Sequence, residues 1–139
     1  MIIYIDDDAD DQLLFEEIVE SYGKEMKVYG KSQEFVSQLD TAPPDGTIVF
    51  LDLNMPFKTG EEVLEIMKAS PLWSKVPVVI LSTSISELTI TNCMRKGANL
   101  YIVKARDYSK LRTSIDYALN IDFDSFVPDE RSFVYYEIV

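Results

Sequence analysis

Short apolar runs rich in β-branched residues occur at intervals along the chain, at residues 1–5, 47–51, 76–81 and 100–103. Each run is followed by polar or turn-forming residues, and none of them alternates apolar with polar positions over its length. Continuous apolar runs of this length predict strands that are buried on both faces. A weaker strand is predicted near Lys27–Tyr29, which brings the predicted number to five.

Between the predicted strands, apolar residues recur three and four positions apart, a spacing that predicts amphipathic helices. The clearest sets are Leu13, Leu14, Ile18 and Val19, then Val63, Leu64, Ile66 and Met67, and finally Leu111, Ile115 and Leu119. A shorter helix is predicted near Glu34–Leu39. Ser84 and Glu87 have the spacing of a capping box that would start a further helix, and Gly97 would end it. Five alternating strand–helix units predict a doubly wound α/β domain.

Length and composition narrow the classes of function. A chain of 139 residues with 47% hydrophobic residues is expected to form one main domain. The net charge of −11 and the absence of clustered Lys and Arg argue against a nucleic-acid partner. The single cysteine, Cys93, and the lack of a leader or a long apolar run predict a cytoplasmic protein without a membrane partner. The absence of histidine excludes a phosphohistidine carrier, so any phosphoryl chemistry must use carboxylates.

Polar side chains of complementary kinds follow four of the predicted strands. Asp6 and Asp7 follow the first strand, Asp52 the third, Ser82 the fourth and Lys104 the fifth. Because parallel strands end at the same edge of a sheet, these groups are expected to lie close together. Clustered carboxylates repel one another unless a cation neutralises them, and oxygen ligands suit Mg²⁺. The sequence therefore predicts a site for a divalent metal and a phosphoryl group.

Four motifs, each on its expected element, resemble those of the response-regulator receiver domain of two-component signalling. They are IYIDDD, FLDLNMPFKTG, PVVILSTS and YIVK, and the resemblance covers residues 1–120. It implies a stand-alone receiver, similar to the chemotaxis regulators. The implied fold is a flavodoxin-like (βα)₅ domain with a five-stranded parallel sheet in the order 2-1-3-4-5.

The resemblance also implies roles for individual residues in phosphoryl transfer. Asp52 corresponds to the phosphoacceptor, and Lys104 to the lysine that pairs with the phosphoryl group. Ser82 corresponds to the hydroxyl that turns toward that group, and Tyr101 to the aromatic residue that then rotates inward. The implied result is a changed surface on the fourth helix, the fifth strand and the fifth helix.

A metal site is implied by the same resemblance. Mg²⁺, with Mn²⁺ as a substitute, would be held by Asp7, Asp52 and the main-chain carbonyl of Asn54. Asp6 would act through an intervening water. The chain would then catalyse only its own phosphorylation and dephosphorylation, which makes it a switch and not a conventional enzyme.

The implied partners are a histidine kinase or a histidine phosphotransfer protein as phosphodonor, and a protein target downstream. A homodimer is a further alternative. The chain departs from the family after Lys104, where Ala105 replaces a proline that is usually preceded by a cis bond. A cis bond before alanine would cost about 2.5–4 kcal/mol. Thr83 also stands where the family often has a smaller residue.

Two other functions are open from the sequence. Residues from Asp6 to Glu17 place oxygen-bearing side chains at most ligand positions of a calcium-binding EF-hand loop, although Asp11 takes the place of the required glycine. Asp6 and Asp8 also match the acidic pair of a Mg²⁺-dependent phosphatase of the haloacid-dehalogenase type. The simplest interpretation of Asp8, Asp10 and Asp11 is that they cap and charge the start of a helix.

The C-terminal segment, residues 121–139, falls outside the five strand–helix units. It is acidic but too apolar for a solvated tail, because it contains Phe126, Val127, Phe133, Val134, Tyr135, Tyr136, Ile138 and Val139. We expect it to pack as an extension on the domain, on a second copy or on a partner.

Overall fold

The computed structural model describes residues 1–135, so Tyr136, Ile138 and Val139 of the apolar tail lie outside the described residues. The strands are β1 (Ile2–Ile5), β2 (Met26–Tyr29), β3 (Ile48–Leu51), β4 (Val78–Ser82), β5 (Leu100–Val103) and β6 (Val134–Tyr135). The helices are α1 (Ala9–Glu20), α2 (Ser32–Val36), α3 (Gly60–Ala69), α4 (Glu87–Arg95) and α5 (Tyr108–Leu119). None of these helices is both long and apolar enough to cross a bilayer.

The strands form one parallel sheet in the order β2-β1-β3-β4-β5-β6. This confirms the predicted doubly wound, flavodoxin-like fold and its order 2-1-3-4-5. The sheet has a sixth strand that the sequence pattern did not predict, because two residues are too few to show a periodicity. All strands run the same way, so their carboxyl ends lie along one edge of the sheet.

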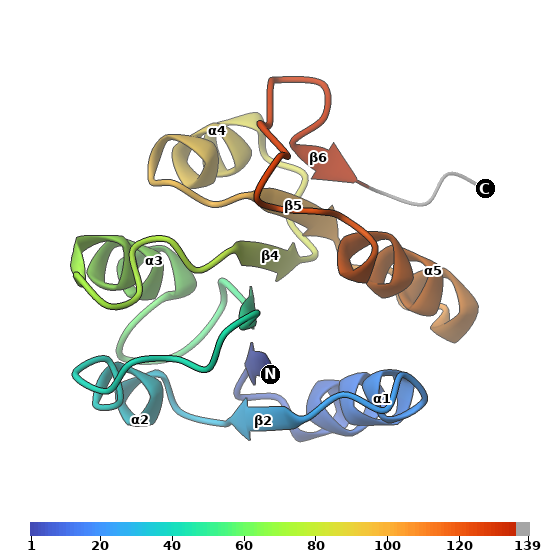
Figure 1. Cartoon of the computed structure of the whole chain (residues 1–139). Coiled ribbons are helices and arrows are strands. Elements are labelled where there is room, and N and C mark those ends of the chain that lie inside the picture. Colours follow the sequence, from blue (N-terminus) through green and yellow to red (C-terminus); the bar gives the residue numbers. More distant parts are fainter. Residues whose placement is uncertain (136–139) are drawn as a thin grey trace.

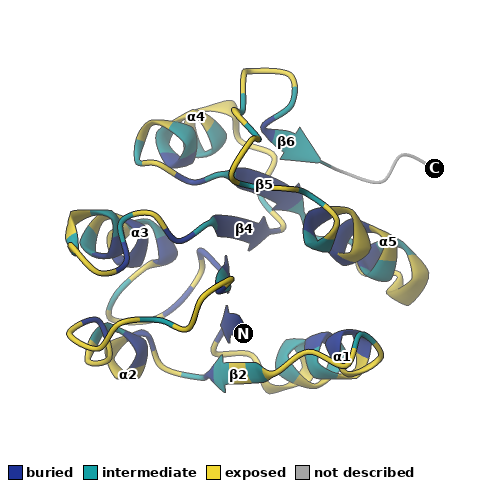
Figure 2. Ribbon diagram, in the orientation of Figure 1, coloured by how far each residue is buried: buried dark blue, intermediate teal, exposed yellow. Residues whose placement is uncertain are grey.

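Two helical layers cover the sheet. In Figure 1, α2, α3 and α4 lie on one face, and α1 and α5 lie on the other. Along β1, Ile3 and Ile5 enter the core beneath the first layer, whereas Ile2 and Tyr4 enter the core beneath the second. The central strands are accordingly buried on both faces, as their continuous apolar sequences predicted (Figure 2).

The acidic run after β1 starts a helix and does not form a calcium-binding loop. Helix α1 begins at Ala9, and the carboxylate of Asp8 caps it by accepting a hydrogen bond from the amide of Asp11 at 2.9 Å. Asp10 and Asp11 lie in its first turn, where negative charge favours the helix. An EF-hand needs its ligands in a loop, but most of residues 6–17 are helical, so the structure gives that alternative no support.

The predicted start of α4 is wrong by two residues. The cap is Ser86, whose Oγ accepts a hydrogen bond from the amide of Thr89 at 3.4 Å. Ser84 lies in the preceding loop, where its Oγ accepts from the amide of Ser86 at 3.2 Å, so it forms no capping box with Glu87. Gly97 follows the helix with a φ of 101°, a left-handed conformation that glycine adopts without strain, as predicted.

The segment after α5 returns to the edge of the sheet beside β5. Phe133 is 1% exposed, and its ring lies 6.3 Å from that of Tyr101 in β5. Tyr135 stacks on Tyr117 of α5 with ring centroids 4.2 Å apart. Val127, by contrast, is 85% exposed. The described part of this segment therefore contacts the domain through a few large side chains.

Candidate functional site

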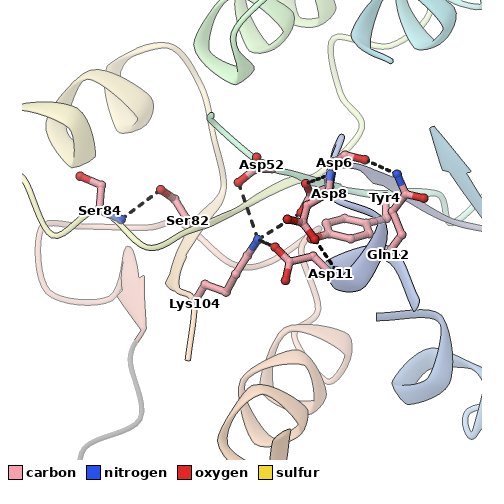
Figure 3. Close-up of polar contacts among 9 residues, drawn as sticks. All are labelled: Tyr4, Asp6, Asp8, Asp11, Gln12, Asp52, Ser82, Ser84 and Lys104. Atoms are coloured by element: carbon pink, nitrogen blue, oxygen red, sulfur yellow. Dashed lines mark hydrogen bonds and ion pairs between the residues drawn. The ribbon is translucent and has the colours of Figure 1, made fainter. Parts of the chain in front are cut away.

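The polar residues at the strand ends meet at the carboxyl edge of the sheet, as predicted. Asp6 follows β1, Asp52 follows β3 and Lys104 follows β5. The ammonium of Lys104 lies 3.1 Å from Asp6 Oδ2 and 3.7 Å from Asp52 Oδ1 (Figure 3). All three side chains are largely buried, so this ion-pair network is weakly screened by water.

Three carboxylates form a cluster that fits a divalent cation. Asp6, Asp7 and Asp52 each offer an oxygen, and these oxygens lie within 4.8 Å of one another. Oxygens this close could be brought to one cation by rotation of the side chains, and carboxylates are ligands that suit Mg²⁺. Asp6 and Asp52 are buried while Asp7 is exposed, which leaves one side of the cluster open to solvent. The residues present therefore suit a partly hydrated Mg²⁺ or Mn²⁺.

Asp6 is held in place by hydrogen bonds from several donors. Its Oδ2 accepts one from the buried hydroxyl of Tyr4 as well as one from Lys104, and its Oδ1 accepts one from the amide of Asp8 at 2.9 Å. The side-chain amide of Gln12 also donates to the main-chain carbonyl of Asp6 at 2.6 Å. Both carboxylate oxygens of Asp6 are thus already engaged.

The environment of Asp52 favours its neutral form when no cation is bound. Burial raises the pKa of Asp52 to about 7, the charge of Asp6 adds to this effect, and the charge of Lys104 opposes it. Its buried side chain lies beside the exposed Asp7, at the open side of the cluster. A cation at this cluster would displace the proton and leave Asp52 ionised.

Lys104 also pairs with a residue that the sequence analysis assigned only to the start of a helix. Asp11 Oδ2 lies 2.9 Å from the ammonium, closer than either Asp6 or Asp52. Burial alone would lower the pKa of Lys104, but the hydrogen bond to Asp11 and the charges of Asp6 and Asp52 outweigh it and raise that pKa. Nothing in the sequence distinguished Asp11 from its neighbour Asp10, because both are acidic residues of one helical turn.

Gly60 allows α3 to start directly behind Asp52. A Cβ atom at this position would lie 2.2 Å from the main-chain oxygen of Asp52 and 2.7 Å from the Cα of Leu53. The amide of Gly60 donates to the carbonyl of Leu53 at 3.0 Å. The glycine therefore permits a close backbone approach that fixes the loop carrying Asp52.

A chain of hydrogen bonds connects the end of β4 with β5. The hydroxyl of the fully buried Ser82 accepts from the amide of Ser84 at 3.2 Å, and the carbonyl of Ser84 accepts from the hydroxyl of Tyr101 at 2.8 Å. Tyr101 is itself fully buried, so its ring points inward. The main-chain amide of Lys104 donates to the carbonyl of Ser82 at 2.7 Å, but among the described residues no hydrogen bond joins the hydroxyl of Ser82 to the side chains of Asp52 or Lys104.

Three further sequence expectations concern the surroundings of the site. Asp8 caps α1 and is not part of the acidic cluster, so the acidic pair of a phosphatase, Asp6 with Asp8, gains no support. The peptide bond between Lys104 and Ala105 is trans, as are the other described peptide bonds. Thr83 lines a hollow of about 270 Å³ beside Lys104 and Asp11.

Comparison with known sequences identifies relatives for most of the chain. Residues 2–116 match the Response regulator receiver domain family. The response regulator Rcp1 of Synechocystis is 37% identical over 68 residues, which cover 49% of this chain and 46% of Rcp1. The chain spans less than half the length of the first curated relatives that it matches.

Solved structures show the same architecture. A response regulator receiver domain from Rhodospirillum rubrum has a TM-score of 0.77 at 28% identity, with 84% of this chain and 89% of that chain covered. The phosphorylated cyanobacterial phytochrome response regulator RcpA has a TM-score of 0.75, also at 28% identity, with 91% and 95% covered. Sequence and structure therefore agree on the relatives of this chain.

Proposed function

Because the chain belongs to the response regulator receiver domain family of two-component signalling, we propose that it is a switch whose Asp52 accepts a phosphoryl group. The observation that carries this proposal is the position of Asp52. It lies buried at a strand end, 3.7 Å from the ammonium of Lys104 and within a cluster with Asp6 and the exposed Asp7. RcpA, which is phosphorylated in its solved structure, provides a precedent at 28% identity.

The proposed reaction is a transfer of a phosphoryl group between two nucleophiles. A carboxylate oxygen of Asp52 attacks the phosphorus of a phosphohistidine on a histidine kinase or phosphotransfer protein. The new oxygen–phosphorus bond forms as the phosphorus–nitrogen bond breaks, and the imidazole nitrogen keeps the electron pair. Lys104 then pairs with a phosphoryl oxygen, for which its flexible stem and compact charge are suited. Water later hydrolyses the acyl phosphate, and the chain turns over no other substrate.

A divalent cation is part of this proposal, with Asp7, Asp52 and the main-chain carbonyl of Asn54 as its ligands. When bound, Mg²⁺ or Mn²⁺ would neutralise the negative charge that gathers between donor and acceptor. Asp6 would contact it through water, which agrees with the hydrogen bonds that already occupy both of its oxygens.

The proposed output is a change in the surface around α4, β5 and α5. Ser82 would donate its hydroxyl proton in a hydrogen bond to the phosphoryl group, and this would draw the Ser82–Ser84 loop toward Asp52. Tyr101, bonded to the carbonyl of Ser84, would follow that loop. A downstream protein would then bind the altered surface.

We further propose that residues 121–139 are an extension of a receiver domain formed by residues 1–120. The burial of Phe133 and the pairing of β6 with β5 support packing on the domain rather than on a partner. Because β6 lies outside β5, the output surface would include β6 (Figure 1). Within residues 1–135, β6 is the edge strand of the sheet, which keeps homodimerisation as an alternative use of this face.

The central test is phosphorylation with a small donor. The chain is incubated with acetyl phosphate and Mg²⁺, and its intact mass is measured. We expect one added phosphoryl group that disappears without Mg²⁺ and in Asp52→Asn, but persists in Asp45→Asn, a control at an exposed loop acid. A mass increase that survives Asp52→Asn, or none in the unaltered chain, would refute the proposal. Sustained hydrolysis of phosphate esters would instead indicate a phosphatase.

A further inference from the structure

Asp11 and Lys104 form the closest ion pair of the site, although Asp11 is not among the proposed metal ligands. Asp11 lies in the first turn of α1, and Lys104 follows β5, 93 residues later in the chain. Their charged atoms lie 2.9 Å apart, and the pair is half-sheltered: the side chain of Lys104 is 10% exposed and that of Asp11 is 38% exposed. An ion pair of this kind is less screened than one on the open surface.

The three carboxylates around Lys104 lie at different distances from its ammonium. Asp11 and Asp6 both lie at hydrogen-bond distance from the ammonium, at 2.9 Å and 3.1 Å, whereas Asp52 lies at 3.7 Å. An ammonium has three donors, and at least two of them are thus directed away from the phosphoacceptor. In Figure 3, dashed lines join the ammonium of Lys104 to Asp6 and Asp11 on one side and to Asp52 on another.

From this geometry we infer that Asp11 is a positioning residue, which draws the ammonium of Lys104 toward α1 and so keeps the carboxylate of Asp52 free. The inference rests on the proposed function, because it concerns the availability of Asp52 to the cation and the phosphodonor. Without Asp11, the N–H group of Lys104 that bonds to it is free to form a hydrogen bond with Asp52 instead. An ammonium bound there competes with Mg²⁺ for the same oxygens.

The arrangement also leaves Lys104 able to move. A hollow of about 270 Å³ borders Asp11 and Lys104 and is lined in addition by Thr83 and Ala105, so the two side chains are not packed rigidly on that side. When a phosphoryl group is added to Asp52, its charge attracts the ammonium more strongly than Asp11 does. Lys104 therefore pairs with Asp11 before phosphorylation of Asp52 and with the phosphoryl group afterwards.

The test compares two acids of the same helical turn. Asp10 is exposed and, within the described residues, forms no ion pair with Lys104, so Asp10→Ala removes one charge without touching this contact. Mg²⁺ affinity is measured by titration calorimetry on the full chain, without a phosphodonor. We expect Asp11→Ala to weaken Mg²⁺ binding about tenfold and Asp10→Ala less than about threefold.

A second pair of variants isolates the role of the ammonium. In a Lys104→Met background there is no ammonium to turn toward Asp52, so the extra loss of Mg²⁺ affinity in Asp11→Ala over Asp10→Ala is expected to shrink to roughly twofold, the direct effect of the nearer charge. Equal effects in the unaltered background, or an extra loss for Asp11→Ala that is just as large with Lys104→Met, would overturn the inference.

The same measurements keep the inference separate from the proposed function. Failure of Asp52 to accept a phosphoryl group, with the expected pattern of Mg²⁺ affinities, would refute only the proposed function. Phosphorylation of Asp52 with equal effects of the two aspartate variants would refute only the positioning role. Absence of Mg²⁺ binding by the unaltered chain would refute both.

Discussion

The hydroxyl of Tyr101 donates a hydrogen bond to the main-chain carbonyl of Ser84 at 2.8 Å, which holds the buried ring of a β5 residue against the loop before α4. The ring of Phe133 lies on the other side, 6.3 Å away, and the carbonyl of Phe133 accepts from the amide of Tyr101 at 2.8 Å. The inward position of Tyr101 is therefore supported both by the loop next to the site and by the C-terminal segment.

Removal of the Phe133 ring is expected to destabilise the domain. Phe133→Ala would leave a cavity beside Tyr101 and lower the free energy of unfolding by about 3–5 kcal/mol, as is typical of buried phenylalanines. Val127→Ala, at an 85% exposed position of the same segment, is the control and should change it by less than about 0.5 kcal/mol. Urea denaturation measures both. Equal stabilities would show that the segment is not packed on the domain in solution.

The C-terminal segment should also protect the main-chain amide of Tyr101 from hydrogen exchange. Because the amide of Tyr101 donates to the carbonyl of Phe133, deletion of residues 121–139 is expected to increase hydrogen exchange at that amide. The amide of Asp52, which donates to the carbonyl of Ile5 in the centre of the sheet, is an internal reference that should change less. Equal acceleration of both amides would indicate general destabilisation and not a local contact.

The hydroxyl of Tyr4 is expected to stabilise the site in the absence of metal. Tyr4→Phe preserves the ring, which stacks on Phe15 at 4.1 Å, but removes the donor to the buried carboxylate of Asp6. Loss of a hydrogen bond to a charged group should cost about 1–2 kcal/mol of unfolding free energy. Tyr22→Phe removes an exposed bond to Asp116 and should cost less. A larger loss for Tyr22→Phe would contradict the role of Tyr4.

Asp52 should make stability depend on pH when metal is absent. The folded protein raises the pKa of this group from 3.8 to about 7, mainly through burial. The stabilising contribution of protonated Asp52 is fully present below the pKa that this group has in the unfolded chain. It is lost as the pH rises through the pKa that the group has in the folded protein. We therefore expect Asp52→Asn to have little effect near about pH 4 and to raise the unfolding free energy by roughly 2–4 kcal/mol near about pH 8.

Denaturation in the presence of a chelator, at several values of pH, would measure this effect. Asp45→Asn, at an exposed acid, should show no such trend. A gain for Asp52→Asn that does not grow with pH would mean that Asp52 is not held in a neutral form. Added Mg²⁺ should reduce the difference at high pH, because a bound cation favours the ionised carboxylate.

Gly60→Ala is expected to displace Asp52. The new Cβ would meet the backbone of Asp52 and Leu53, which cannot move aside as a flexible side chain can. We expect a loss of about 2 kcal/mol or more in unfolding free energy, together with weaker Mg²⁺ binding. Gly30→Ala is the control, because its Cβ would lie 3.2 Å from the side-chain amide of Gln12, and a side chain can shift by a few tenths of an ångström more easily than backbone can. Similar effects of the two variants would argue against a specific contact at Asp52.

The sequence by itself determined the sheet and most of the site. Continuous apolar runs specified strands buried on both faces, and this implies a parallel sheet with helices on both sides. The polar residues directly after those runs, including Asp6, Asp52 and Lys104, had to meet at one edge because parallel strands end together. These conclusions follow from local patterns, so they needed no coordinates.

Only the tertiary structure decided which charges pair and where the C-terminal segment lies. Asp10 and Asp11 are equivalent in sequence, but the angle at which α1 packs on the sheet brings only Asp11 to Lys104. Likewise, β6 is too short to have a periodicity and forms because Phe133 and Tyr135 find partners in β5 and α5. Hydrophobic patterning shows that a face is buried, whereas the choice of partner depends on distances set by the packing of elements remote in sequence.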